Sequence, residues 1–402
     1  MKNLMTVVLF GIVLIGCNQK KTEVKTSTTT ADVKDDASIS SPLSLEKLWE
    51  LDGFSMPESV LAPRNHDWIY VSNVNGKEPG FISRLTKDGK IDDLKWASNL
   101  DGPTGMGIFN NQLFTGSGSR VDVIDLSTGK LIKSIVSEEA TTLNDIAISP
   151  DGQVFVSNVV DGGIYTIVKD EIVLFIKDDK IAHPNGLLFS GSYLYVGDYG
   201  GGLDPDFKAD AYGSLYRINM LDKSLELVKN GEKLGGLDGV TNLDNTVIAS
   251  SNPTGKVFGI AKDGHFTIGE FTKGVADIDI KETTLFAPNI FENKVRAFAI
   301  KGGNDWQRIM TKQEYMDKAA NVFFGDEGGQ SVATKSGKIF GIFGGEELSG
   351  TWEWKDDYFC RTSTLGTMDL GLDCLVIEVT DTKMRLTLEK GNGIQVVYDR
   401  KD

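Results

Sequence analysis

Short apolar runs recur six times between residues 45 and 300, and each run carries a small or polar residue at the same place. When the runs are aligned, this first column reads Glu58, Thr104, Asn144, Asn185, Asp238 and Ala276. Consecutive members lie 46, 40, 41, 53 and 38 residues apart. Self-similarity at such a period is typical of propellers and solenoids.

A second column of strand ends follows the first one in every repeat. Its last residues are Asn73, Ser117, Asn158, Asp198, Asn252 and Asn289. Turns such as Ser149-Pro150-Asp151-Gly152 separate the runs, because proline fixes φ and glycine accepts positive φ. About four short strands per repeat match a propeller blade. The sequence therefore predicts an all-β fold with a six-bladed β-propeller over residues 43–300, whereas the alternative, a two-sheet sandwich, demands no sixfold period.

The first strand, Leu45 to Leu51, precedes the first column and has no blade of its own. We expect it to close the ring by pairing with the last blade around Val295 to Ile300. Closure of this kind leaves few exposed sheet edges.

The repeat stops near residue 300, and a different pattern follows. Residues 301–328 are predicted to be a linker with a short helix, where Thr311 is the N-cap and Glu314 completes a capping box. Residues 329–402 alternate again and predict a small antiparallel β-domain of about five to seven strands. Its aromatic residues either line a ligand face or form the core of the sheet. They are Trp352, Trp354, Tyr358 and Phe359.

The N-terminus has the pattern of a targeting signal. Lys2 precedes an apolar stretch that is too short for a good transmembrane helix, and Leu14-Ile15-Gly16-Cys17 follows it. This motif resembles the bacterial lipobox, which implies a signal peptide over residues 1–17 and a lipidated Cys17. The alternative is an ordinary secretory signal with an incidental cysteine. Residues 18–42 are polar and predict a disordered tether. We expect the protein in the bacterial cell envelope, on the periplasmic face of the outer membrane, attached by its lipid anchor alone.

The chain has three cysteines, Cys17, Cys360 and Cys374. Lipidation of the first would leave an even pair in an oxidising compartment, which favours a disulfide between Cys360 and Cys374. No Cys or His residues have the spacing of a metal site in this segment.

The net charge of −15, without a basic stripe, argues against a nucleic-acid partner. It is compatible with cation binding. Four members of the first column carry ligand oxygens: the carboxylates of Glu58 and Asp238 and the amides of Asn144 and Asn185. On a propeller axis these four would converge, and their charge of −2 would balance one divalent ion. Because His and Cys are absent from the set, Ca²⁺ is favoured, with Zn²⁺ or Mn²⁺ as alternatives.

Two other interpretations of these residues stay open. Asn and Asp are common turn formers, so the column could be structural. Asp145 and Asp277, which follow the first column, could hold a second ion or cap turns.

The motifs around these four residues resemble the metal-binding motifs of the SMP-30/gluconolactonase/LRE-like family of six-bladed propellers. They are Pro57-Glu58-Ser59-Val60, Asn144-Asp145, Pro184-Asn185-Gly186-Leu187 and Leu237-Asp238-Gly239-Val240. The resemblance covers about residues 45–300 and implies a lactone hydrolase with a central divalent metal. We expect the protein to be a monomer. Carried over, Glu58, Asn144, Asn185 and Asp238 would be its ligands, and a small lactone or ester would be its substrate.

The same resemblance allows roles to be assigned to individual residues. A metal would polarise the ester carbonyl, and Asp238 could double as general base. His183 lies two residues before Asn185 and could line the pocket or shuttle protons, or be a surface histidine. Sugar lactonases of this family usually have an arginine where this chain has Thr142, which argues against sugar lactones.

The fourth repeat is longer than the others because of an insertion over residues 200–210, and this glycine-rich loop is a possible lid. The rival hypothesis is a non-catalytic lipoprotein whose propeller uses the ion for stability and binds a ligand or a protein.

Overall fold

The computed structural model describes residues 41–402 apart from residues 65, 204–208, 210, 245, 303–305, 327, 392, 394 and 402. The predicted signal peptide, Cys17 and the tether up to residue 40 lie outside the described residues. The chain divides between residues 303 and 304 into two compact units. None of the helices in the described part is long and apolar enough to cross a membrane.

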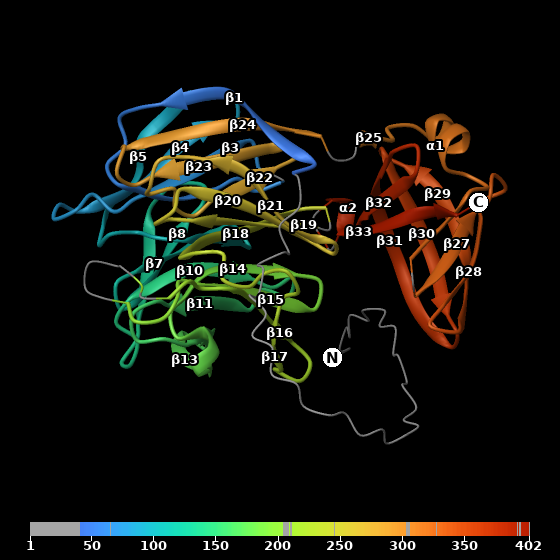
Figure 1. Cartoon of the computed structure of the whole chain (residues 1–402). Helices are drawn as coiled ribbons and strands as arrows, with labels where there is room; N and C mark the ends of the chain where they lie inside the picture. Colours follow the sequence, from blue (N-terminus) through green and yellow to red (C-terminus); the bar gives the residue numbers. More distant parts are fainter. Residues whose placement is uncertain are drawn as a thin grey trace, which may run out of the picture. The chain divides into compact units, whose positions relative to one another are not determined.

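The first unit consists of six four-stranded antiparallel sheets (Figure 1). Blades one to three are β2 (Pro57–Leu61), β3 (Trp68–Asn73), β4 (Gly80–Thr86) and β5 (Ile91–Leu100); β6 (Met106–Phe109), β7 (Gln112–Ser117), β8 (Arg120–Asp125) and β9 (Leu131–Val136); and β10 (Leu143–Ile148), β11 (Val154–Asn158), β12 (Ile164–Val168) and β13 (Glu171–Ile176). The 3-10 helix η1 (Asp179–Ile181) follows.

Blades four to six complete the ring. They are β14 (Pro184–Ser190), β15 (Tyr193–Asp198), β16 (Leu215–Asn219) and β17 (Leu225–Leu227); β18 (Leu237–Leu243), β19 (Thr246–Ser251), β20 (Lys256–Ala261) and β21 (Gly264–Glu270); and β22 (Asp279–Lys281), β23 (Thr284–Asn289), β24 (Lys294–Gly302) and β1 (Leu43–Leu51). The sixfold period therefore predicted the fold correctly.

The second strand of a blade is mostly buried, and β11 is buried along its whole length, whereas no residue of the outermost strand β13 is buried. The cause is packing between blades: Tyr70 and Trp96 of blade one share a core with Leu113 and Ile124 of blade two. A strand covered on both faces reads as a continuous apolar run, which is the pattern that marked the repeats.

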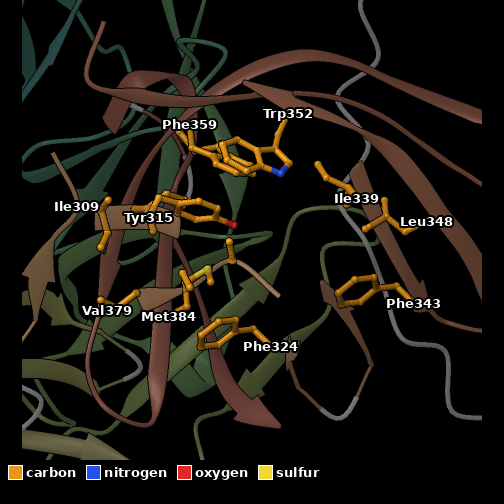
Figure 2. Packing of buried hydrophobic residues seen from close by; sticks show 14 residues of the cluster. Ile309, Tyr315, Phe324, Ile339, Phe343, Leu348, Trp352, Phe359, Val379 and Met384 are labelled. Carbon is orange, nitrogen blue, oxygen red and sulfur yellow. The ribbon is translucent and has the colours of Figure 1, made fainter. Parts of the chain in front are cut away.

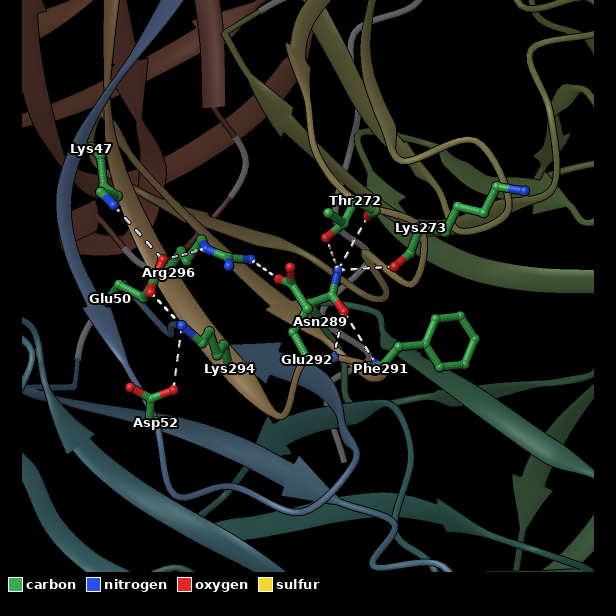
Figure 3. A network of polar contacts seen from close by, with 10 residues as sticks. All are labelled: Lys47, Glu50, Asp52, Thr272, Lys273, Asn289, Phe291, Glu292, Lys294 and Arg296. Atoms are coloured by element: carbon green, nitrogen blue, oxygen red, sulfur yellow. Dashed lines mark hydrogen bonds and ion pairs between the residues drawn. The ribbon is translucent and has the colours of Figure 1, made fainter.

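The first strand closes the ring, as its sequence position predicted. It pairs with β24 from Leu43 opposite Gly302 to Leu51 opposite Val295. Glu50 ties the two strands together, because its Oε1 accepts from Lys294 Nζ at 2.6 Å and its Oε2 accepts from Arg296 Nε at 2.8 Å (Figure 3). These hydrogen bonds, first to Lys294 and then to Arg296, lower the pKa of Glu50 to about 2.

The second unit begins with β25 (Gln307–Arg308) and helix α1 (Lys312–Lys318). Thr311 caps α1 and forms the predicted capping box with Glu314. Eight strands follow, with the short helix α2 (Leu388–Gly391) before the last one. They are β26 (Phe323–Gly325), β27 (Gly329–Ala333), β28 (Lys338–Phe343), β29 (Glu346–Lys355), β30 (Tyr358–Leu365), β31 (Met368–Val379), β32 (Lys383–Thr387) and β33 (Gln395–Lys401).

These eight strands form a closed antiparallel barrel, because β26 pairs with β33 and β31 pairs with β32. The C-terminal domain is thus all-β and antiparallel as predicted, but it closes on itself and has more strands than expected. One of them, β26, comes from the segment predicted to be a linker. Closure removes every edge except the one that β25 covers on β31.

The barrel interior is aromatic at one end. Tyr315 of α1 packs against Trp352 and Phe359, with ring centroids 4.9 and 4.8 Å apart (Figure 2). Trp352 and Phe359 are therefore core residues, one of the two alternatives for the aromatic group. Cys360 and Cys374, which lie opposite each other on β30 and β31, form the expected disulfide.

Candidate metal site on the propeller axis

The four ligand-capable members of the first column share one local structure, a bulge in the innermost strand of their blade. In each, two residues of the inner strand face one residue of the next strand. The register shifts fall between Pro57 and Val60, Leu143 and Ile146, Pro184 and Leu187, and Leu237 and Val240. A bulge re-aims the side chain that it contains. The other two members, Thr104 and Ala276, precede the first residue of their strands β6 and β22.

A bulge leaves a backbone N–H without its partner in the ladder, and a serine from the second strand accepts it in three of these blades. The pairs are Ser59 N with Ser72 Oγ at 2.9 Å, Asp145 N with Ser157 Oγ at 2.9 Å, and Gly239 N with Ser250 Oγ at 2.8 Å. The second column of the sequence contains these serines. Their recurrence fixes the bulges that position the first column.

The structure brings the four predicted ligands together. Asn185 Nδ2 lies 3.4 Å from Asp238 Oδ1, and the charges of Asp238 and Asp145 and the amide of Asn144 all act on Glu58. Glu58, Asn185 and Asp238 are each no more than 5% exposed. Burial, followed by the neighbouring carboxylates, raises the pKa of Glu58 well above its usual range, and burial raises the pKa of Asp238 to about 7.

Two buried oxygens of this set have no hydrogen-bond partner among the described residues, Glu58 Oε2 and Asn185 Oδ1. Buried polar atoms are nearly always satisfied, so these two mark a place for a donor or a cation. Carboxylate and amide oxygens are the ligands that Ca²⁺ prefers. No group of three or more His, Cys, Asp or Glu side chains in the described chain is arranged for a metal ion, so a site here depends on its two amides as well.

One residue of the second column, to which the sequence reasoning gave no role at the site, braces this set. Asn252 follows β19 and donates its Nδ2 to Asp238 Oδ2 at 2.8 Å. Tyr199 is also near, because the charge of Asp238 adds to burial in raising the pKa of the phenol. Asn252 belongs to the second column, and Tyr199 directly follows the column residue Asp198, which was the available signal.

The next column contains Asp145 and Asp277, and their side chains cap backbone and hydroxyl groups. Asp145 accepts from Ile146 N at 2.7 Å and from Leu187 N, in the following blade, at 2.6 Å. Asp277 accepts from Ser59 Oγ across the junction of the last and first blades. These contacts favour the capping interpretation over a second ion.

His183 is engaged away from the first column. Its backbone N–H donates to Asp198 Oδ1 at 2.9 Å, and its Nδ1 lies 2.8 Å from the carbonyl oxygen of Val159. The carbonyl can only accept, so Nδ1 carries the proton and Nε2 is the nitrogen left for other chemistry. Among the described residues, no hydrogen bond joins the His183 ring to the four predicted ligands.

Two further sequence features can be placed. Thr142 donates its backbone N–H to Asn158 Oδ1 at 3.2 Å. The proposed lid over residues 200–210 lies mostly outside the described residues.

No family model matches the chain, and no curated protein matches it significantly. Several solved structures resemble it in part. A candidate gluconolactonase is 18% identical over 65% of this chain and 93% of its own, with a TM-score of 0.48. An inactive virginiamycin B lyase from Staphylococcus aureus with quinupristin is 13% identical over 64% of this chain and 99% of its own, with a TM-score of 0.45.

A protein of unknown function from Bacteroides thetaiotaomicron is 12% identical over 64% of this chain and 76% of its own, with a TM-score of 0.49. Likenesses at these levels do not transfer function, because one fold hosts many chemistries. The six-bladed propeller implied by the sequence motifs is confirmed by the structure itself, and function has to be argued from the site.

Proposed function

We propose that this chain is a divalent-metal-dependent hydrolase of lactones or esters, with its site on the propeller axis. The observation that carries the proposal is the pair of unpartnered buried oxygens, Glu58 Oε2 and Asn185 Oδ1, beside the carboxylate of Asp238. Such a set is costly without a cation, because buried carboxylates repel each other and lose their hydration.

Glu58, Asn144, Asn185 and Asp238 would hold the ion, with Ca²⁺ first and Zn²⁺ or Mn²⁺ as alternatives. A bound divalent ion supplies a Lewis acid for the ester carbonyl and lowers the pKa of bound water. The two amides are neutral, so the charge of −2 on the two carboxylates would balance one divalent ion.

The two carboxylate oxygens of Asp238 differ in their hydrogen bonds. Oδ2 accepts from Asn252 at 2.8 Å, whereas Oδ1 has only the long 3.4 Å contact with Asn185. Oδ1 is therefore the oxygen that would accept a proton from an attacking water. Asn252 would keep the carboxylate oriented, and Asp238 would return the proton to the leaving alkoxide as the ester C–O bond breaks. Because Thr142 replaces the family's arginine, we expect simple lactones or esters rather than sugar lactones.

Turnover of a lactone and ester panel tests this proposal. The protein is treated with chelator and then assayed with Ca²⁺, Mn²⁺ or Zn²⁺, beside Asp238→Ala and the exposed control Asp263→Ala on the same blade. We expect metal-dependent turnover that Asp238→Ala lowers by about 100-fold or more and that Asp263→Ala retains. Equal activity of the two variants would refute the role of the site.

The same experiment distinguishes the hydrolase from the rival hypothesis of a non-catalytic propeller. A cation that raises the melting temperature, with no turnover on any substrate, would instead support a non-catalytic, metal-stabilised propeller that binds a ligand or protein.

The proposed attachment to the cell envelope is tested separately. Lipidation at Cys17 predicts that the expressed protein fractionates with membranes and that Cys17→Ser releases it. Membrane association of both forms would contradict the anchor.

A further inference from the structure

The C-terminal barrel contains a cavity that the propeller chemistry does not involve. A closed barrel of eight strands has an interior that side chains just fill or that holds one small ligand. This interior leaves about 40 Å³, which is room for about three water molecules. Most of its lining is apolar: Phe324, Ile339, Phe359, Leu375, Ile377 and Met384.

One cation lines this apolar space. Arg361 lies on β30 opposite Trp352, on the inward face of the strand, and its side chain borders the cavity. Among the residues that the structure describes, neither a hydrogen bond nor an ion pair is formed by its guanidinium. Other arginines of this chain do have carboxylate partners, such as Arg385 with Glu378 at 2.7 Å. A guanidinium against an apolar lining without a counter-ion is a ready site for an anion.

The same strand face carries a second polar group without a partner. Ser363 lies two residues beyond Arg361, is 3% exposed, and its Oγ has no hydrogen-bond partner in the described chain. Residues two apart on a strand point to the same side. A buried hydroxyl is normally satisfied by protein, water or ligand, so Ser363 indicates a polar occupant on this side of the barrel.

Tyr398 of β33 borders the cavity from another wall. Burial and then the charge of Asp326 raise the pKa of its phenol, and the charge of Arg361 opposes that rise, which places the guanidinium within electrostatic reach of the hydroxyl. The polar end of the cavity therefore has a cation and a hydroxyl donor from two different strands.

We infer that this cavity binds a small monocarboxylate of about one or two carbons, with its carboxylate on Arg361 and its methyl group, where it has one, against the apolar lining. A planar carboxylate matches the fork of a guanidinium and carries the one charge that the site lacks. A multiply charged, strongly hydrated phosphate fits the apolar lining poorly. The inference does not depend on the metal site of the propeller.

Calorimetric titration of the full chain with acetate tests this inference. Acetamide, a neutral molecule of the same shape, and inorganic phosphate serve as comparison ligands. We expect saturable binding of acetate, weaker by about tenfold or more in Arg361→Gln and intermediate in Arg361→Lys. Arg400→Gln removes an exposed arginine of the same barrel and should leave the affinity unchanged.

Three results would overturn the inference: no saturable binding of acetate, equal affinity for acetamide, or tighter binding of phosphate. The first would leave the cavity to water alone. These comparisons use the unaltered chain, so they decide the matter even if Arg361→Gln fails to fold. Near-ultraviolet circular dichroism of the cluster of Tyr315, Trp352 and Phe359 would report the folding of each variant.

Discussion

Asn252 donates its side-chain amide to Asp238 Oδ2 over 2.8 Å, so that a residue of the second column holds a residue of the first. Asp238 lies in the bulge of β18, and Asn252 follows the neighbouring strand β19. The contact fixes one oxygen of the carboxylate and leaves the other toward Asn185. The pairing of β18 with β19 in blade five therefore determines how Asp238 is oriented at the candidate metal site.

Removing this brace should weaken metal binding more than it weakens the fold. We expect Asn252→Ala to lower Ca²⁺ affinity by about 10- to 100-fold, because groups that orient ligand carboxylates have effects of this size. Calorimetry of the chelator-treated protein measures it. Asn158→Ala is the matched control, because Asn158 has the same place in blade three but bonds to Thr142 N and Asp161. Equal affinities in the two variants would contradict the role of Asn252.

The substitution Glu58→Gln separates two effects of the buried carboxylate, its destabilisation of the metal-free fold and its contribution to Ca²⁺ binding. Without metal the variant should be at least as stable as the parent, because a neutral amide removes repulsion from Asp238. With Ca²⁺ at about 100 times its dissociation constant, the parent should gain roughly 5 to 10 °C in melting temperature and the variant little.

Differential scanning calorimetry with and without chelator checks this expectation. The exposed residue Glu226 provides the control substitution Glu226→Gln, which should keep the full Ca²⁺ response. A Ca²⁺ response of equal size in Glu58→Gln would place the ion elsewhere.

The six blades could be predicted from the sequence because the apolar run and the column residue recur together at one period. The sequence was also sufficient for ring closure, since the predicted strand from Leu45 to Leu51 had no blade of its own. The contact between Asn252 and Asp238 could not be read from spacing, because it depends on bulges that shift the register between two strands.

The barrel was underestimated for a different reason. Strand β26 has only three residues, Phe323–Gly325, and β30 has polar residues at the inward positions Arg361 and Ser363. Apolar alternation cannot reveal a strand whose inward face is partly polar. Departures from the local rule of this kind are expected at functional positions, which agrees with the cavity that Arg361 borders.

Glycine in the column next to the ligands is required by the close approach of neighbouring inner strands. A Cβ at Gly105 would lie 2.2 Å from Asp145 Oδ1 and 2.5 Å from Asp145 Cα. We expect Gly105→Ala to destabilise the propeller by at least about 2 kcal/mol, because the backbone of blade three would have to move. Denaturant unfolding measures this loss. Gly201→Ala is the control, with the nearest atom 3.8 Å away, and should be neutral.

The hydrogen bonds of Glu50 to Lys294 and Arg296 predict that the stability of the propeller depends on pH. The pKa of Glu50 is held at about 2 by Lys294 and Arg296, below the ordinary value of 4.5. The ionised form is the one that the fold favours, so the contribution of Glu50 is present above pH 4.5 and is lost as the pH falls towards 2. The difference in stability between the parent and Glu50→Gln should shrink over that interval. A difference that stays constant from pH 6 to pH 2 would show that these hydrogen bonds contribute nothing.

Loss of the disulfide should destabilise the barrel alone, because both cysteines lie within it. Cys360 and Cys374 are 14 residues apart and join β30 to β31 within the barrel. Opening a loop of this size removes about 3 kcal/mol through the entropy of the unfolded chain. The double variant Cys360→Ala, Cys374→Ala should therefore lower the unfolding transition of the barrel and leave that of the propeller unchanged. Calorimetry resolves the two transitions, and Ca²⁺ identifies the one that belongs to the propeller. If both transitions shifted together, the two units would be energetically coupled and would not unfold independently.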